Sequence, residues 1–178
     1  MIAFVSGGAR SGKSGVAEAL VGDRQAARGG ARYYLATARA GDAEMARRIA
    51  RHRRQRGEGW TTLEAPLEIA GALDGLEAGS SVLLDCLTIW ASRVLFEAGW
   101  QPAGGRRELA RLLATARRRD LDLVVVSNDL NEDLPPRESL VWRYLAFLQR
   151  LHRDLAAEAD RVIEVVAGQP IDWKGDAP

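Results

Sequence analysis

The chain of 178 residues contains one cysteine, two histidines and no long apolar run. A single cysteine, Cys86, excludes an intramolecular disulfide. A leader in which basic residues precede an apolar run is also missing, so the sequence predicts a cytoplasmic protein. No apolar run reaches the roughly 18 residues of a membrane span, so we expect no transmembrane segment.

An excess of charge of either sign is also absent. The chain has 25 Lys and Arg against 24 Asp and Glu, a net charge of +1. No overall field would attract nucleic acid, and we expect no nucleic-acid partner. Hydrophobic residues make up 47% of the chain, enough for one domain with a sizeable core. We expect that domain over residues 1–172, followed by a frayed tail at 173–178.

Lysine is nearly absent as well, because arginine supplies almost all the positive charge and only Lys13 and Lys174 occur. Lys13 stands in the segment GGARSGKS, which fills every fixed position of the G-x-x-x-x-G-K-[ST] phosphate-binding loop. A lysine kept where arginine is otherwise preferred indicates a need for its compact ammonium group. A chance match in a glycine-rich chain is the alternative.

The surroundings of the loop are those that the motif requires. An apolar run at residues 2–5 favours a buried strand, and residues 15–20 favour a helix. Loop N–H groups and the helix N-terminus would then face phosphate oxygens. We predict that Lys13 contacts the β and γ phosphates and that Ser14 holds Mg²⁺. The predicted nucleotide-binding residues are Gly7, Gly8, Ala9, Arg10, Ser11, Gly12, Lys13 and Ser14.

Strand and helix patterns alternate along the rest of the chain. Further strands are predicted at residues 33–37, 61–63, 81–85, 121–127 and 161–166. Helices are predicted at about 42–56, 66–76, 87–98, 106–118 and 138–159. Near-continuous apolar strands between helices predict an α/β fold, with a mostly parallel sheet covered by helices on both faces.

Polar residues follow two of these strands. Asp85 ends an apolar strand, where a carboxylate can orient hydrated Mg²⁺ beside a phosphate-binding loop. Capping of the next helix is the alternative role. Ser127, Asn128 and Asp129 follow the most apolar strand at the same edge and either contact phosphate or substrate or form a simple turn.

The predicted helix at 42–56 places His52 on one stripe with Met45 and Ile49, among many arginines. A neutral imidazole near a nucleotide can attack an α-phosphate while guanidinium groups hold its oxygens. A structural histidine beside a solvated or partner-docking arginine face is the alternative. His152, between Leu151 and Leu155 in an arginine-rich helix, is interpreted as structural, and Cys86 as a small packed residue.

Together these residues resemble the bifunctional adenosylcobinamide kinase/adenosylcobinamide-phosphate guanylyltransferase family. The resemblance rests on GGARSGKS, on YLATA at 34–38 and on LDCLT at 84–88 with Trp90. It also rests on a series of residues in the family's spacing: Asp42, Glu44, Met45, Arg48, Ile49, His52, Arg56, Trp60 and Glu64.

This resemblance implies a single RecA-like P-loop NTPase domain that uses Mg²⁺ and ATP or GTP. Such an enzyme phosphorylates the corrinoid adenosylcobinamide and then transfers GMP from GTP through a guanylyl-histidine. His52 matches the histidine of the family's R-I-x-x-H pattern, with Lys13 and Asp85 as further catalytic residues. Thr37, Arg48, Arg56 and Glu64 would join the nucleotide site, and a homo-oligomer is expected.

The second half departs from the family's pattern. Residues 127–136 read SNDLNEDLPP where the family has S-N-E-V-G-x-G-I-V-P, so both glycines are lost. The family's R-D and G-x-x-N positions appear as Leu145-Ala146 and as residues 149–152. One alternative is therefore a paralogue that keeps one step or acts on another alcohol. Another is a nucleotide-binding regulatory module whose arginine helix binds a partner.

Overall fold

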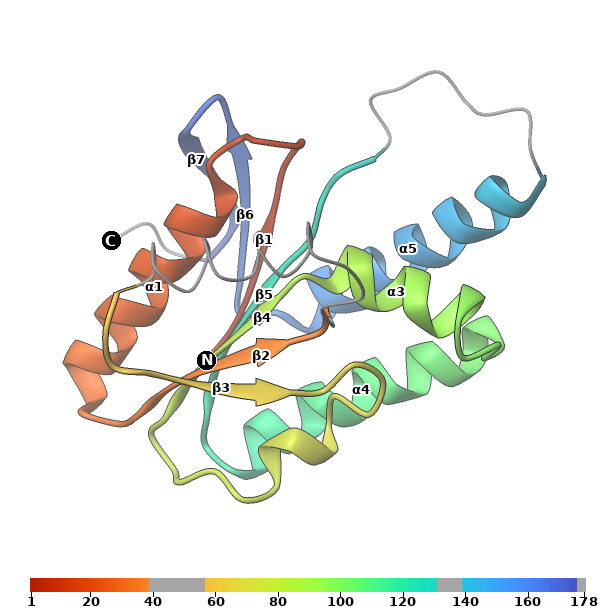
Figure 1. Cartoon of the computed structure of the whole chain (residues 1–178). Helices are drawn as coiled ribbons and strands as arrows, with labels where there is room; N and C mark the ends of the chain where they lie inside the picture. Colours follow the sequence, from red (N-terminus) through yellow and green to blue (C-terminus); the bar gives the residue numbers. More distant parts are fainter. Residues whose placement is uncertain (39–56, 131–138, 176–178) are drawn as a thin grey trace.

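The computed structural model describes residues 1–38, 57–130 and 139–175, and its centre is a seven-stranded sheet (Figure 1). The strands lie in the order β3-β2-β4-β5-β1-β6-β7, and all neighbours are parallel except β6 and β7. Their bounds are β1 Ile2–Ser6, β2 Arg32–Ala36, β3 Trp60–Glu64, β4 Ser81–Asp85, β5 Asp122–Val126, β6 Arg161–Val166 and β7 Gln169–Lys174.

Helices cover both faces of this sheet, as Figure 1 shows. On one face α1 (Lys13–Arg28) packs Ala17, Leu20 and Val21 against β1, β4, β5 and β6. The other face carries α3 (Leu87–Phe96), α4 (Pro102–Arg118), α5 (Ser139–Glu158) and the 3₁₀ helix η1 (Gly71–Leu73). Every residue of β5 is buried, because a central parallel strand has both faces covered. The predicted α/β fold is confirmed.

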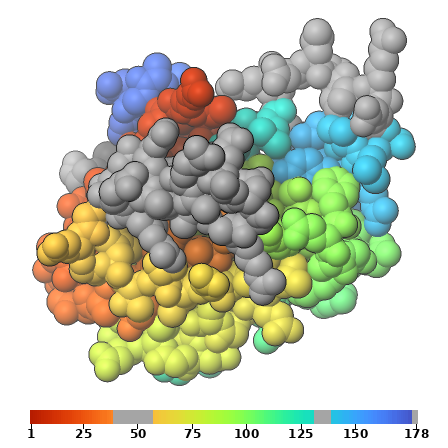
Figure 2. All heavy atoms as spheres, in the orientation of Figure 1, coloured from red at the N-terminus to blue at the C-terminus, as the bar shows by residue number. Residues whose placement is uncertain are grey.

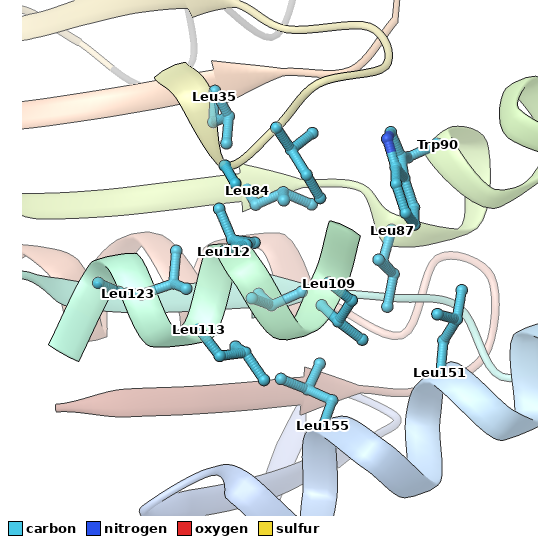
Figure 3. Close-up of a cluster of buried hydrophobic side chains, with 14 of the residues drawn as sticks. Leu35, Leu84, Leu87, Trp90, Leu109, Leu112, Leu113, Leu123, Leu151 and Leu155 are labelled. Atoms are coloured by element: carbon cyan, nitrogen blue, oxygen red, sulfur yellow. The ribbon is translucent and has the colours of Figure 1, made fainter. Parts of the chain in front are cut away.

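The larger core lies between the sheet and helices α3, α4 and α5 (Figure 3). Its largest fully buried side chain, Trp90, donates its indole N–H to the Leu67 carbonyl at 2.8 Å. Leucines of α4 and α5 pack with leucines of β4 and β5 in this core. The packing holds these helices against the sheet.

The helix predicted at residues 66–76 is wrong, because only the short η1 forms there. Gly71 and Gly75 lower the helix propensity of the segment. Its polar backbone groups find tertiary partners instead: the Ala70 N–H donates to the buried Glu108 carboxylate at 2.9 Å, and the Leu67 carbonyl accepts from Trp90. Tertiary contacts replace the helical hydrogen bonds.

The tail predicted to fray from Trp173 is also corrected, since β7 extends to Lys174 and pairs antiparallel with β6. The Trp173 indole N–H donates to Glu164 at 2.9 Å, and Lys174 Nζ donates to two carbonyls at the end of α5, those of Ala156 and Ala157. Every residue of β7 is exposed, and its alternation of Ile171 and Trp173 with polar residues is too short to predict a strand.

The other predicted strands are confirmed with shifts of one residue at their ends, and α4 begins earlier than predicted, with Pro102 in its first turn. The helix predicted at 42–56, with His52, Arg48 and Arg56, lies outside the described residues.

Candidate nucleotide-binding site

The glycine-rich loop joins β1, which ends at Ser6, to α1, which begins at Lys13. A Cβ at Gly7 would lie 2.5 Å from the Val165 carbonyl oxygen and 2.7 Å from Ser11 Oγ, so only glycine fits there. Gly12 is the N-cap of α1 with a left-handed φ of 93°. Along the loop Ala9, Arg10 and Gly12 are exposed, and Gly8 is partly buried.

Lys13 lies inside the loop rather than in solvent. Its side chain is buried, and Nζ donates to the Gly8 carbonyl at 2.8 Å. Burial lowers the pKa of Lys13, while the negative charge of Asp85 acts in the opposite direction. The ammonium group and the strand-end carboxylate are therefore close enough to influence each other.

Two serines of the loop have chemistry that suits phosphate and metal ligands. Ser11 Oγ is buried and has no hydrogen-bond partner among the described residues. A buried polar group without a partner is costly, so a phosphate oxygen would stabilise it. Ser14 is partly buried in the first turn of α1, at the end of the helix that favours anions.

Asp85 ends β4 at the edge of the sheet where the loop lies. The register pairs it with Ala36 of β2 and Val126 of β5. The Tyr34 hydroxyl lies 3.4 Å from Asp85 Oδ2 and 3.3 Å from the Asp85 carbonyl oxygen. The N-cap of α3 is Cys86, the residue that follows Asp85.

Thr37 and Glu64 lie at the same edge. The buried Thr37 hydroxyl donates to the Cys86 carbonyl at 3.1 Å, and the Thr37 carbonyl accepts from Arg93 at 2.7 Å. Glu64 is exposed at the end of β3, where Ala36 is its register partner. Thr37 therefore supports the backbone that follows Asp85.

Beyond the end of β5, the buried side chains of Thr88 and Ser127 meet the partly buried His152. Ser127 Oγ lies 2.9 Å from Thr88 Oγ1 and 2.7 Å from His152 Nε2. The Asn128 N–H donates to Thr88 Oγ1 at 2.8 Å, and the Asp129 N–H donates to the Gly7 carbonyl at 3.0 Å. Thr88 and His152 were not predicted to lie here, because partners 39 and 25 residues from Ser127 leave no local pattern.

The turn between β6 and β7 packs on the outer side of the loop. The Gly168 N–H donates to the Ser11 carbonyl at 2.8 Å, and a Cβ at Gly12 would lie 3.4 Å from Gly168 Cα. Figure 2 shows the C-terminal hairpin (blue) directly beside the start of the chain (red). The hairpin thus supports the loop backbone.

A groove of about 630 Å³ between α4 and α5 contains none of the predicted site residues. Its floor is aliphatic, with Leu109, Leu113 and Ala157, and Arg106 and Asp154 form an ion pair at its rim. Of the three arginines that line the groove, Arg106 and Arg117 are paired with Asp154 and Glu158, so the candidate site remains the strand edge. In the described part of the chain, no helix has the length and hydrophobicity to cross a membrane.

A strand, a glycine-rich loop and a helix at the carboxyl edge of a parallel sheet define a P-loop nucleotide-binding protein. A KaiC-like protein from Pyrococcus horikoshii OT3 has a similar fold, with a TM-score of 0.51 and 12% identity over 92% of this chain and 69% of that chain. This likeness confirms the predicted RecA-like fold.

The chain belongs to the cobinamide kinase/cobinamide phosphate guanyltransferase family, whose model matches residues 3–173. A bifunctional adenosylcobalamin biosynthesis protein from Pseudomonas aeruginosa is 42% identical over 174 residues, 97% of both chains. A protein of the same description from Escherichia coli K12 is 33% identical over 180 residues, 94% of this chain and 97% of the relative. The family resemblance seen in the sequence is confirmed, and the chain is an enzyme of this family.

Proposed function

We propose that this enzyme phosphorylates adenosylcobinamide with a nucleoside triphosphate and then transfers GMP from GTP to the phosphorylated corrinoid. The products are adenosylcobinamide-GDP and pyrophosphate. Family membership supports both reactions. The observation that best supports the kinase step is that Lys13 is buried inside the P-loop. The charge of Asp85, at the end of β4, acts on its ammonium group.

In the kinase step, the corrinoid side-chain hydroxyl attacks the γ-phosphorus of ATP or GTP. A new O–P bond forms, the bond between the γ-phosphorus and the β-phosphate oxygen breaks, and the hydroxyl proton passes to solvent. Lys13 and the N–H groups of the loop would stabilise the negative charge on the leaving β-phosphate. Ser11 Oγ, which has no partner among the described residues, would donate to a phosphate oxygen.

Ser14 and Asp85 would hold Mg²⁺. A hydroxyl and a carboxylate are hard oxygen donors, which Mg²⁺ prefers, and it commonly takes its remaining ligands from water and phosphate. When bound, the ion would neutralise charge on the phosphates. The hydroxyl of Tyr34 beside the Asp85 carboxylate would restrict how that carboxylate turns.

In the transferase step, a ring nitrogen of His52 attacks the α-phosphorus of GTP and pyrophosphate leaves. A phosphate oxygen of the corrinoid phosphate then attacks the same phosphorus, and the bond to His52 breaks. Arg48 and Arg56 would hold the α-phosphate oxygens, since guanidinium forks match that geometry. We include Thr37 and Glu64 in the nucleotide site because both lie at the edge beside Asp85.

A kinase that lacks the transferase step is the second candidate. The segment at 127–136, which lacks the family's two glycines, favours it, since a backbone that needs glycine there would be altered.

Incubation with adenosylcobinamide, GTP and Mg²⁺, followed by mass analysis of the corrinoid products, distinguishes these functions. The bifunctional enzyme yields adenosylcobinamide-GDP and pyrophosphate. Adenosylcobinamide phosphate as the sole product would show the kinase-only enzyme. Nucleotide binding with no corrinoid product would refute both and favour the regulatory module.

The proposal places the enzyme in the cytoplasm, consistent with the single cysteine. A homo-oligomer is part of the proposal, and sedimentation equilibrium tests it.

A further inference from the structure

Thr88, Ser127 and His152 form a largely buried polar cluster beyond the end of β5, here called the edge network. The hydroxyls of Thr88 and Ser127 lie 2.9 Å apart, and Ser127 Oγ lies 2.7 Å from His152 Nε2. Thr88 and Ser127 are buried, and the His152 ring packs against Phe4 with centroids 5.2 Å apart. Polar groups in such surroundings stabilise a structure only when they are fully hydrogen-bonded.

The donors and acceptors of the edge network can be assigned in one order that satisfies every group. The Asn128 N–H donates to Thr88 Oγ1, and each hydroxyl carries a single proton. All groups are satisfied when Thr88 donates to Ser127 and Ser127 donates to His152 Nε2. This order requires a neutral imidazole, and burial lowers the pKa of His152 to about 4, although the charge of Asp129 raises it. At neutral pH, His152 is therefore neutral, and its Nε2 accepts from Ser127 in the tautomer that carries the proton on Nδ1.

The network ends at the candidate nucleotide site. Asn128 and Asp129 are partly buried, and their backbone is held from two sides. Thr88 at the start of α3 accepts from the Asn128 N–H, and Gly7 of the P-loop accepts from the Asp129 N–H. His152 supports this arrangement from α5, whose Leu151 and Leu155 are fully buried.

We propose that His152 is a positioning residue that acts through Ser127 and Thr88 to hold Asn128 and Asp129 against the P-loop, where this segment recognises the terminal phosphate of the nucleotide. This inference rests on the proposed phosphoryl transfer and revises the interpretation of His152 as purely structural. A leucine at position 152 would fill similar space but leave Ser127 Oγ without its acceptor.

The test compares His152→Leu, His152→Gln and wild type. Glutamine is chosen because its amide oxygen can accept from Ser127 in place of Nε2. Arg153→Leu is the matched control, since Arg153 is an exposed neighbour on the same helix. Each protein is checked for folding by its melting temperature. The readouts are kcat for phosphoryl transfer and the affinities for ADP and a non-hydrolysable ATP analogue, each with Mg²⁺.

We expect His152→Leu to lower kcat about tenfold and to reduce the ATP-analogue-to-ADP affinity ratio by about the same factor, the scale of one hydrogen bond. Affinity for ADP should stay within about twofold, because the P-loop binds the remaining phosphates. His152→Gln should recover most of both losses, and Arg153→Leu should match wild type.

The inference is overturned if His152→Leu keeps kcat and the affinity ratio within about twofold of wild type, or if His152→Gln is as impaired as His152→Leu. If His152→Leu does not fold, Ser127→Ala replaces it. We expect the same losses in kcat and in the affinity ratio, and values unchanged from wild type would overturn the inference. A wild-type protein that prefers the ATP analogue but transfers no phosphoryl group would refute the proposed function alone. In that case the affinity ratio still tests the role of His152.

Discussion

At the scale of single residues, the proposed phosphate chemistry depends most on Lys13. We expect Lys13→Ala to lower phosphoryl-transfer turnover by at least about a hundredfold at saturating nucleotide and to weaken nucleotide binding, since a donor to developing charge is lost. Lys13→Arg should not restore turnover, because the planar guanidinium does not fit the buried position of a compact ammonium.

Lys174→Ala is the matched control for this change. Lys174 is the only other lysine, and it donates to carbonyls at the end of α5 rather than to the loop. Its loss should leave turnover within about twofold of wild type. Near-wild-type turnover in Lys13→Ala would contradict the assigned role.

Asp85→Asn tests the proposed metal ligand, because it keeps the shape of the side chain and removes its charge. We expect activity and its dependence on Mg²⁺ to be lost while the fold remains intact. A magnesium titration of turnover, with melting temperature as the check on folding, measures this effect. Asp74→Asn, at an exposed position, should show the same dependence of turnover on Mg²⁺ as wild type. An unchanged titration in Asp85→Asn would remove Asp85 from the metal site.

At the scale of elements, α4 contains two adjacent glycines in very different surroundings. A Cβ at Gly105 would lie 2.5 Å from Phe147 of α5, whereas one at Gly104 would meet nothing closer than 3.9 Å. We expect Gly105→Ala to destabilise the protein by about 1–3 kcal/mol through overpacking. Gly104→Ala should stabilise it by up to about 1 kcal/mol through helix propensity. Urea unfolding measures both, and equal effects would contradict the packing between α4 and α5.

Elements were predicted from sequence where their signal is local. The loop motif predicts the β1–α1 unit, and buried apolar runs predict β4 and β5 because both faces of those strands are covered. The segment at 66–76 and the strand β7 were not predicted correctly. In both, hydrogen bonds to other elements decide the conformation, such as Ala70 to Glu108 and Lys174 to Ala156.

At the scale of the whole molecule, the strand order creates the site by bringing distant strand ends to one edge. Asp85 was predicted to lie there because the carboxyl ends of parallel strands share an edge. His152 was not, since its place beside Ser127 depends on how α5 docks on the sheet. The roles of His52, Arg48 and Arg56 stay predictions, because these residues lie outside the described part of the chain.

The amino-terminal ends of the strands, opposite the candidate site, contain a buried charge that makes stability depend on pH. Asp122 is fully buried and pairs with the Met1 ammonium at 2.9 Å and with Arg24 at 3.1 Å. Burial raises the pKa of Asp122, but hydrogen bonds from Met1 and Arg24 and their charges outweigh it, so the pKa lies below its usual value. This ion cluster therefore adds stability above the unfolded-state pKa of about 3.9, and the contribution is lost as pH falls through the lower folded-state pKa.

Asp122→Asn should accordingly lower the free energy of unfolding by about 1–3 kcal/mol at pH 7, a value reduced because Arg24 is partly exposed to solvent. The difference from wild type should shrink below about pH 3.9. Asp120→Asn is the control, since Asp120 pairs with Arg28 at the surface and should change stability by less than about 1 kcal/mol. Urea unfolding across this pH range would contradict the assignment if the difference for Asp122→Asn grew on acidification.

The central claim is that one chain carries two reactions on separate nucleophiles, and covalent labelling with α-³²P-GTP tests it most directly. With Mg²⁺, wild-type protein should form an acid-labile, base-stable GMP phosphoramidate. His52→Ala should form none, yet still phosphorylate adenosylcobinamide within about threefold of the wild-type rate, because the P-loop step uses the corrinoid hydroxyl as its nucleophile. A GMP adduct on His52→Ala, or none on the wild-type protein, would contradict the claim.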